Sequence, residues 1–270
     1  MLVPREALRF DFRGARFRLP RDAALLGWIA DQFLYGEVTG IQCGHWLYGA
    51  PTLDAATFFA RQAAEELGHV RVFLRLHTLL GTRPGPAHPV VRWLSTGSMG
   101  RDFAEHVCTE MAEGEGMVLA VLQALIDTVD DPAVVRLLEG TAQQEERHVA
   151  FGEQQTLAVV RADPALGPSL LGMNLLSLLA LPRLARHIQR RLGTEHEVLG
   201  QAAAFLEHLV RLTELRLQRL GVLDGPLAGL SAPRRAWLII RAMVRRQWVR
   251  WRRTPRLTDT YLEDPLLRGH

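Results

Sequence analysis

Two glutamate–histidine pairs with the same spacing are the residues of this chain best suited to chemistry. Glu66 precedes His69 by three positions, and Glu145 precedes His148 by the same interval. Residues three apart on an α-helix project from neighbouring points of one face, so each pair directs a carboxylate and an imidazole to one place. Because carboxylate oxygens and imidazole nitrogens together suit iron or manganese, each pair predicts half of a metal site.

A further carboxylate, Glu37, lies on a segment upstream of the first pair whose apolar residues recur with helical spacing. At about 100° per residue, Glu37 falls on the side that also carries Phe33 and Ile41. An unpaired carboxylate on a buried face is strongly unfavourable. Glu37 is therefore expected to face a metal or another cation.

The segment 101–128 offers three more candidates: Glu110, Glu113 and Glu115. On an α-helix, Glu110 and Glu113 share a stripe with Met117, whereas Glu115 lies off it. The expected turn at 130–132 places Glu113 and Glu115 level with the second Glu-x-x-His pair. Glu113 meets both criteria and is the predicted ligand, with Glu110 or Glu115 left open as a replacement or an addition. The complete predicted set is Glu37, Glu66, His69, Glu113, Glu145 and His148.

A Glu from each of two helices plus Glu-x-x-His from each of two others is the ligand set of bundles that hold a carboxylate-bridged pair of metals. On these residues the chain resembles the ferritin-like di-iron carboxylate superfamily, over roughly residues 22 to 160. The stretch 145–152, EERHVAFG, is similar to the E-x-R-H-x-x-F-G of ribonucleotide reductase small subunits and related ligand-binding oxidases. Most reductase small subunits carry a radical tyrosine where this chain has Phe73, so a tyrosyl radical there is excluded.

The resemblance implies a dinuclear centre with two iron ions, or Mn/Fe or Mn/Mn as alternatives, and no catalytic residue beyond the ligands. It implies an O2-activating oxidase or monooxygenase that hydroxylates, desaturates, N-oxidises or deformylates a hydrophobic organic substrate, with electrons from an external reductase or ferredoxin. The alternative is a ferroxidase or a radical-generating subunit without its own organic substrate. A long apolar cavity beside the carboxylates would favour the first class, and a hydrophilic iron channel the second.

The elements that must position these residues are helices, and the predicted fold is all-α. We expect an N-terminal arm (1–21), a ferritin-like four-helix bundle (22–162) with a long crossover at 82–100, and a C-terminal helical extension (163–270) packed on the bundle. The expected helices cover 22–48, 53–80, 101–128, 132–162, 165–192 with a bend at Pro182, 196–220 and 232–253.

Several other residues should surround the centre. An apolar shell is expected from Phe33, Ile41, Phe59, Phe73, Met117 and Val121. Gln62 and Thr141 each lie one turn before a motif Glu, where they could bond to the ligands or be ordinary polar residues of the core. His45, His77 and His106 are expected to be core histidines rather than ligands.

The last expected helix is rich in arginine and tryptophan. Its apolar face carries Trp237, Val244 and Trp251, and arginines occupy the rest of 234–253. The simplest expectation is that the tryptophan face docks on the bundle and the arginines are solvated. An anionic partner at this helix, whether an acyl-carrier protein, an acidic membrane surface or RNA, is the alternative.

Composition excludes several other classes of protein. All 32 basic residues are arginine, which rules out a lysine Schiff base and a Walker-type phosphate loop. The two cysteines, Cys43 and Cys108, lie in apolar helical segments and are expected to be reduced core thiols. Arginines interrupt the N-terminal segment, so no signal peptide is expected and a cytoplasmic location follows. Monomer and homodimer both stay open.

Overall fold

The computed structural model describes residues 1–19, 21–97, 99–192, 196–251 and 264 of the 270-residue chain. Helices dominate these residues, and the β-structure among them is limited to one isolated bridge between Phe17 and Val129. The all-α prediction is therefore confirmed. Within the same residues, no helix is both long and apolar enough to cross a bilayer.

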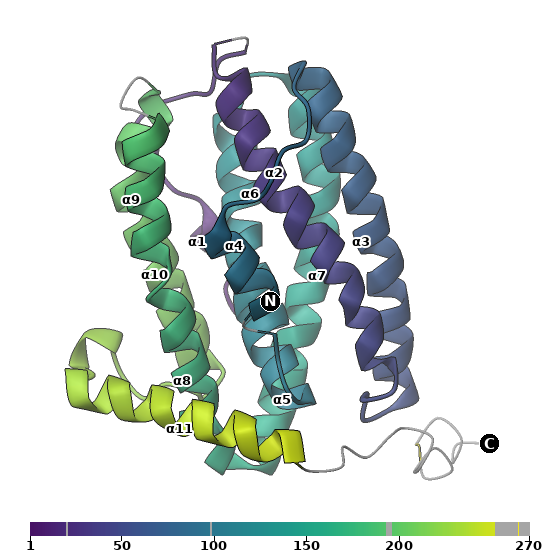
Figure 1. Ribbon diagram of the computed structural model, residues 1–270, viewed down its shortest axis with the longest axis vertical. Coiled ribbons are helices and arrows are strands. Elements are labelled where there is room, and N and C mark those ends of the chain that lie inside the picture. Colours follow the sequence, from purple (N-terminus) through teal and green to yellow (C-terminus); the bar gives the residue numbers. More distant parts are fainter. Residues whose placement is uncertain (20, 98, 193–195, 252–263, 265–270) are drawn as a thin grey trace.

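Four long helical segments follow the N-terminal arm. They are α2 (Ala23–Gly40) with its 3₁₀ continuation η1 (Ile41–Leu47), α3 (Leu53–Leu80), α5 (Phe103–Glu105) continued by η3 (His106–Glu115) and α6 (Gly116–Thr128), and α7 (Pro132–Ala162). Figure 1 shows them side by side, α3 and α6 running in one direction and α2 and α7 in the other. Their facing sides enclose the predicted ligands.

Local sequence explains where these helices begin and end. The side chains of Thr52, Asp102 and Asp131 each accept a hydrogen bond from a backbone N–H in the first turn of the following helix. Pro132 occupies the first turn of α7, where its missing N–H is not needed. Gly81 ends α3 with a φ of 64°, a left-handed conformation that glycine adopts without steric cost.

The segment η3 departs from the expected regular α-helix, because its ten residues are π-helical. A π-helix closes hydrogen bonds from residue i to i+5, so side chains five apart stack on one face. Glu110 and Glu115 are related in this way, whereas α-helical spacing relates Glu110 to Glu113. This change of period decides which carboxylate of the segment faces the other predicted ligands.

The crossover between α3 and α5 runs back along α2 and contains α4 (Pro89–Arg92) and the π-turn η2 (Trp93–Gly97). Two polar residues of α2 hold it in place. Asp31 Oδ1 accepts a hydrogen bond from Gly85 N at 2.6 Å, and Gln32 Oε1 accepts one from His88 N at 2.7 Å. The polar side of α2 therefore binds the crossover backbone.

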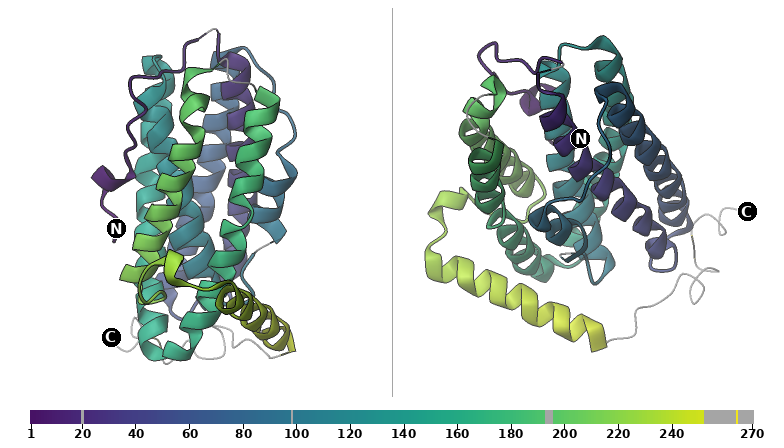
Figure 2. Two further views of the ribbon diagram at one scale, coloured as in Figure 1. Left: turned by 90° about the vertical axis from the view of Figure 1, so that its left-hand side faces the viewer. Right: turned by 45° about the horizontal axis from the view of Figure 1, so that its top comes forward.

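The C-terminal part consists of α8 (Gly167–Leu178), α9 (Leu181–Leu192), η5 (Glu197–Gln201), α10 (Ala202–Arg219) and α11 (Ala232–Trp251). Pro182 lies in the first turn of α9, so the expected bend is a break just before it. Helices α8, α9 and α10 line one side of the long helices, and α11 crosses their lower end (Figures 1 and 2). The expected end of α11 at 253 lies outside the described residues.

Helix α11 docks through a different face from the one predicted. Its buried residues are Leu238, Ala242 and Arg246, whereas the tryptophan face points outward. Glu105 is fully buried and forms ion pairs with Arg245 at 3.1 Å and Arg246 at 3.4 Å. A buried carboxylate needs a cation, and this requirement turns the arginines inward.

Candidate metal centre

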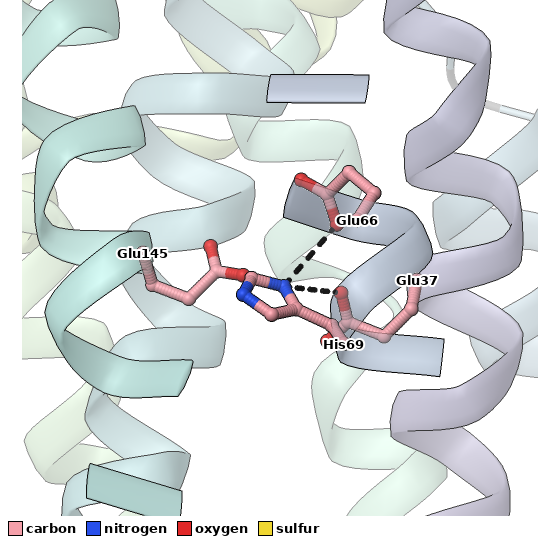
Figure 3. A group of neighbouring side chains, drawn as sticks. All are labelled: Glu37, Glu66, His69 and Glu145. Carbon is pink, nitrogen blue, oxygen red and sulfur yellow. Dashed lines mark hydrogen bonds and ion pairs between the residues drawn. The ribbon is translucent and has the colours of Figure 1, made fainter. Parts of the chain in front are cut away.

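Carboxylates and imidazoles from all four long segments converge at one place in the interior, and all but the half-buried Glu115 are buried. The side chains are Glu37 from α2, Glu66 and His69 from α3, Glu115 from η3, and Glu145 and His148 from α7. Figure 3 shows four of them, with the carboxylates of Glu37, Glu66 and Glu145 directed at the ring of His69. They form two groups that could each hold a metal ion and that share Glu66.

The first group is built around His69. Its Nδ1 atom lies 3.0 Å from Glu37 Oε2, 3.1 Å from Glu145 Oε1 and 3.5 Å from Glu66 Oε2. These ligand atoms lie within 4.8 Å of one another. Three carboxylates and one ring nitrogen therefore face a common point.

The second group is built around His148. Its Nδ1 atom lies 3.3 Å from Glu66 Oε1 and 3.5 Å from Glu145 Oε2, and Glu115 completes the group. Glu66 and Glu145 each approach both imidazoles, so they stand between the two groups. Glu37 belongs to the His69 side and Glu115 to the His148 side, which differs from the expected split into one Glu-x-x-His pair per metal.

Each imidazole is held from outside by the residue that precedes the glutamate on the opposite helix. His69 Nε2 donates to Gln144 Oε1 at 2.7 Å, and His148 Nε2 donates to Glu65 Oε2 at 2.7 Å. With the proton on Nε2, the neutral ring turns a bare Nδ1 toward the carboxylates, as a metal-binding histidine requires. Sequence reasoning missed Glu65 and Gln144, although each directly precedes a motif glutamate.

Of the two polar residues expected near the ligands, one takes part in the centre. Gln62 Nε2 donates to Glu115 Oε1 at 2.8 Å and lies 3.5 Å from Glu66 Oε1. Thr141 is buried, but its hydroxyl faces the carbonyl of Leu137 at 3.4 Å and does not contact a ligand. Gln62 thus orients the carboxylate contributed by η3.

The structure places Glu113 apart from this cluster, and the preference for it over Glu115 needs correction. Glu113 is buried beside Arg216 of α10, with its Oε2 atom 3.5 Å from Arg216 Nη1. Arg216 also forms an ion pair with Glu153 at 3.2 Å. The physical reason is the π-helical period of η3, which rotates Glu115 inward and Glu113 toward α10.

The third candidate, Glu110, is also outside the two groups. Its Oε2 atom lies 3.1 Å from His106 Nδ1, and its other oxygen accepts a hydrogen bond from the backbone of Gly100. Glu110 nevertheless lines the same cavity as the ligands. It therefore stands one π-turn from Glu115, where it can contact what enters the cavity.

The electrostatics of the cluster call for positive charge. Burial raises the pKa of Glu37 and Glu115 well above the ordinary value, and neighbouring carboxylates raise it further. Burial alone would lower the pKa of His69, but Glu145, Glu37 and Glu66 together raise it. Two imidazoles cannot offset four carboxylates, whereas two divalent cations can.

Unsatisfied polar atoms support the same conclusion. His148 Nδ1 and Glu115 Oε2 are buried without a hydrogen-bond partner in the described part of the chain. Buried polar atoms are rarely left unpaired, and those that are need an explanation such as an ion. The six residues therefore fit a pair of oxygen-preferring metal ions.

A predominantly apolar cavity of about 470 Å³ adjoins the cluster. Five carboxylates form part of its wall: Glu37, Glu66, Glu110, Glu115 and Glu145. Much of the remainder consists of apolar side chains from α2, α6, α9 and α10, among them Phe33, Val118, Val121, Leu184, Phe205 and Leu209. An organic molecule in this cavity would lie against the carboxylates without an intervening wall.

The expected apolar shell and core histidines are mostly where the sequence placed them. Phe33, Phe59 and Phe73 are buried, and Phe33 stacks on Phe73 with ring centroids 5.0 Å apart. Met117 and Val121 line the cavity, and Ile41 is half-buried.

Of the three histidines expected in the core, two are buried. His77 bonds to Thr82 Oγ1 at 2.9 Å, and His106 packs against Trp46. His45, in contrast, is exposed.

Compared with models of known protein families, with curated proteins and with solved structures, the chain gives no match. Its function is therefore inferred from the geometry of the site and its cavity.

Proposed function

We propose that the chain is a ferritin-like, O2-activating dinuclear iron oxidase or monooxygenase that acts on a hydrophobic organic substrate. The observation that carries this proposal is the convergence of two oriented imidazoles with three buried carboxylates and the half-buried Glu115, all four carboxylates lying on the wall of a large apolar cavity. The arrangement of α2, α3, α6 and α7, with α3 and α6 parallel and joined by a crossover, agrees with the four-helix bundle in which such centres are built.

Two iron ions, or a Mn/Fe or Mn/Mn pair, would supply the redox chemistry with O2. The residues of the chain hold and tune this centre. Glu66, which both groups share, and Glu145, which approaches both imidazoles, would help to hold both ions, whereas Glu37 and Glu115 would each help to hold one. Four carboxylates offset the charge of two divalent ions, and carboxylates suit hard, oxygen-preferring metals.

The surroundings suit substrate oxidation better than metal storage. The volume of the cavity lies in the range of pockets that bind small organic molecules. Phe33, Phe59 and Phe73 are buried, and Phe33 lines the cavity. Electrons would come from a separate reductase or ferredoxin, as the family resemblance implies.

The assignment of the fourth carboxylate gives a direct test. In Glu115→Gln, Fe(II)-dependent O2 consumption should fall at least about tenfold, the usual effect of disturbing a metal ligand shell. Glu113→Gln is the matched control, because it makes the same chemical change two positions away on η3 and should retain most of the activity. An oxygen electrode with anaerobically loaded protein measures both.

Equal losses in the two variants, or the larger loss in Glu113→Gln, would contradict the proposed centre. The same measurement separates the two functional classes. A substrate oxidase should stop consuming O2 once its bound iron is oxidised, unless a reductant is added. Continued oxidation of excess Fe(II) far beyond the number of bound ions would instead indicate a ferroxidase.

A further inference from the structure

Helix α11 presents a continuous apolar stripe to the outside of the molecule. Its members recur every three or four residues: Trp237, Ile240, Val244, Trp248 and Trp251. Ile240 and Val244 are 62% and 63% exposed, and Trp251 is 85% exposed. Aliphatic and aromatic side chains this exposed, contiguous on one helix, mark an interaction surface.

The opposite face of α11 fixes this orientation. Leu238 and Ala242 are buried against α8, where a Cβ atom at Gly172 would overlap the backbone of Leu238. Arg245 and Arg246 point the same way and pair with the buried Glu105. The stripe cannot turn inward without breaking these ion pairs, so its exposure is built into the docking of the helix.

Positive charge borders the stripe. Helix α11 contains arginines and no acidic residue. Arg234 and Arg241 lie over the ring of Trp237, at 4.5 Å and 5.4 Å from its centroid. Among the described residues, no ion pair engages Arg234, Arg241 or Arg250. Arg234 and Arg250 are exposed near the two ends of the helix.

We propose that α11 is a membrane-surface helix that binds the headgroup region of an anionic lipid bilayer. An amphipathic helix with tryptophan and aliphatic residues on one face and arginine beside them lies in the plane of the interface, with the apolar side chains at the acyl boundary. Tryptophan side chains favour the headgroup level of the membrane–water interface. Figures 1 and 2 show α11 on the outside of the molecule, across one end of the long helices.

Other occupants fit the stripe less well. Ile240 and Val244 at its centre have no aromatic face for a nucleic-acid base and no hydrogen-bonding group for a phosphate. A second copy docked by the same face would bring its own arginines against Arg234 and Arg250, and like charges facing each other oppose association. A bilayer of anionic lipids satisfies both the apolar stripe and its basic border.

The test is flotation of the full-length protein with vesicles. Equal parts of phosphatidylglycerol and phosphatidylcholine should carry the protein upward, and phosphatidylcholine alone should carry much less. The double variant Ile240→Asp and Val244→Asp should lose most of the binding. The control Leu74→Asp and Leu79→Asp puts the same charge at exposed apolar positions of α3 and should bind as the unmodified chain does.

A second variant changes only two exposed arginines, so that a loss of binding does not simply reflect a folding defect. Arg234→Gln with Arg250→Gln leaves the stripe intact and should weaken binding to anionic vesicles about fivefold for each charge removed. Absence of binding, equal binding by the Ile240/Val244 variant, or preference for a polyuridine competitor would overturn the proposal. A second outcome would also overturn it: the protein does not bind vesicles and is a dimer in solution that the Ile240→Asp and Val244→Asp variant converts to a monomer.

Discussion

In the candidate metal centre, each imidazole is fixed between an outer hydrogen-bond acceptor and an inner group of carboxylates. Gln144 holds His69, and Glu65 holds His148. The two rings stand at opposite ends of the cluster, with Glu66 and Glu145 between them. The loss of one ring should therefore empty one of the two metal positions and leave the other.

His69→Ala and His148→Ala test this arrangement separately. Each variant should bind about one iron ion per chain, because four carboxylates and the remaining imidazole still complete one position. Metal analysis after anaerobic loading and desalting gives the number. Gln143→Ala, an exposed substitution on α7, is the control and should not change the metal content. Unchanged stoichiometry in both histidine variants would remove them from the ligand set.

Residue type and spacing predicted five of the six side chains that converge, namely Glu37, Glu66, His69, Glu145 and His148. They could be predicted because α2, α3 and α7 keep an ordinary helical period around them. The sixth could not, since the choice between Glu113 and Glu115 assumed about 100° per residue in a segment that is π-helical. Arg216, which compensates Glu113, lies on a helix distant in the sequence.

At the element scale, α7 approaches η3 closely at Gly152. A Cβ atom on Gly152 would lie 2.6 Å from the Cβ of Met111 and 2.7 Å from the backbone nitrogen of Ala112. Glycine at this position therefore lets the π-helical segment pack directly on α7. The contact lies on the helix pair that supplies Glu115, Glu145 and His148.

Gly152→Ala should accordingly destabilise the protein by about 1–3 kcal/mol, the usual effect of overpacking a core. Gly140→Ala is the matched control on the same helix, because no atom lies within 4 Å of its added Cβ. It should stabilise α7 by about 0.5–1 kcal/mol, since alanine favours the helix over glycine. Urea denaturation followed by circular dichroism measures both, and a Gly152→Ala protein as stable as the unmodified chain would contradict the packing.

Helix positions and caps followed from local sequence, but the way two elements dock did not. The sequence offered Thr52 or Asp54 as the cap of α3, and Thr52 takes that place; Asp131 caps α7, as its position before Pro132 predicts. The outward stripe of α11 was missed because local periodicity shows that two faces differ and not which of them is buried. That choice depends on Glu105, a carboxylate from another element that requires Arg245 and Arg246.

On the scale of the whole molecule, Asp22 joins three parts of the chain. Its carboxylate accepts hydrogen bonds from the backbone of Arg18 in the arm at 2.6 Å and from the Arg21 side chain at 2.9 Å. It also contacts His196, before α10, at 2.6 Å. Burial opposes ionisation of Asp22, but these partners outweigh it and lower its pKa from 3.8 to about 2.

Because the pKa of Asp22 is lower in the folded chain than in the unfolded chain, its ionised carboxylate stabilises the fold. This stabilisation is fully present above the pKa of the unfolded chain and is lost as the pH falls through the pKa of the folded chain. Between about pH 4 and pH 2 the unmodified chain should lose about 2 kcal/mol of stability from this group. Asp22→Asn should be less stable at neutral pH and show a smaller loss across that range. Asp130→Asn, on an exposed turn, controls for the change of charge alone. Parallel acid profiles for Asp22→Asn and the unmodified chain would contradict the role of Asp22.

The number of metal ions that the purified chain binds tests the central claim most directly. Protein stripped with a chelator, reloaded with Fe(II) in the absence of O2 and desalted should contain two iron ions per chain. Replacing Glu66 and Glu145 together by alanine should abolish binding, since both groups of ligands depend on these carboxylates. A chain that retains no iron, or that binds as much iron without Glu66 and Glu145, would contradict a dinuclear centre at this site.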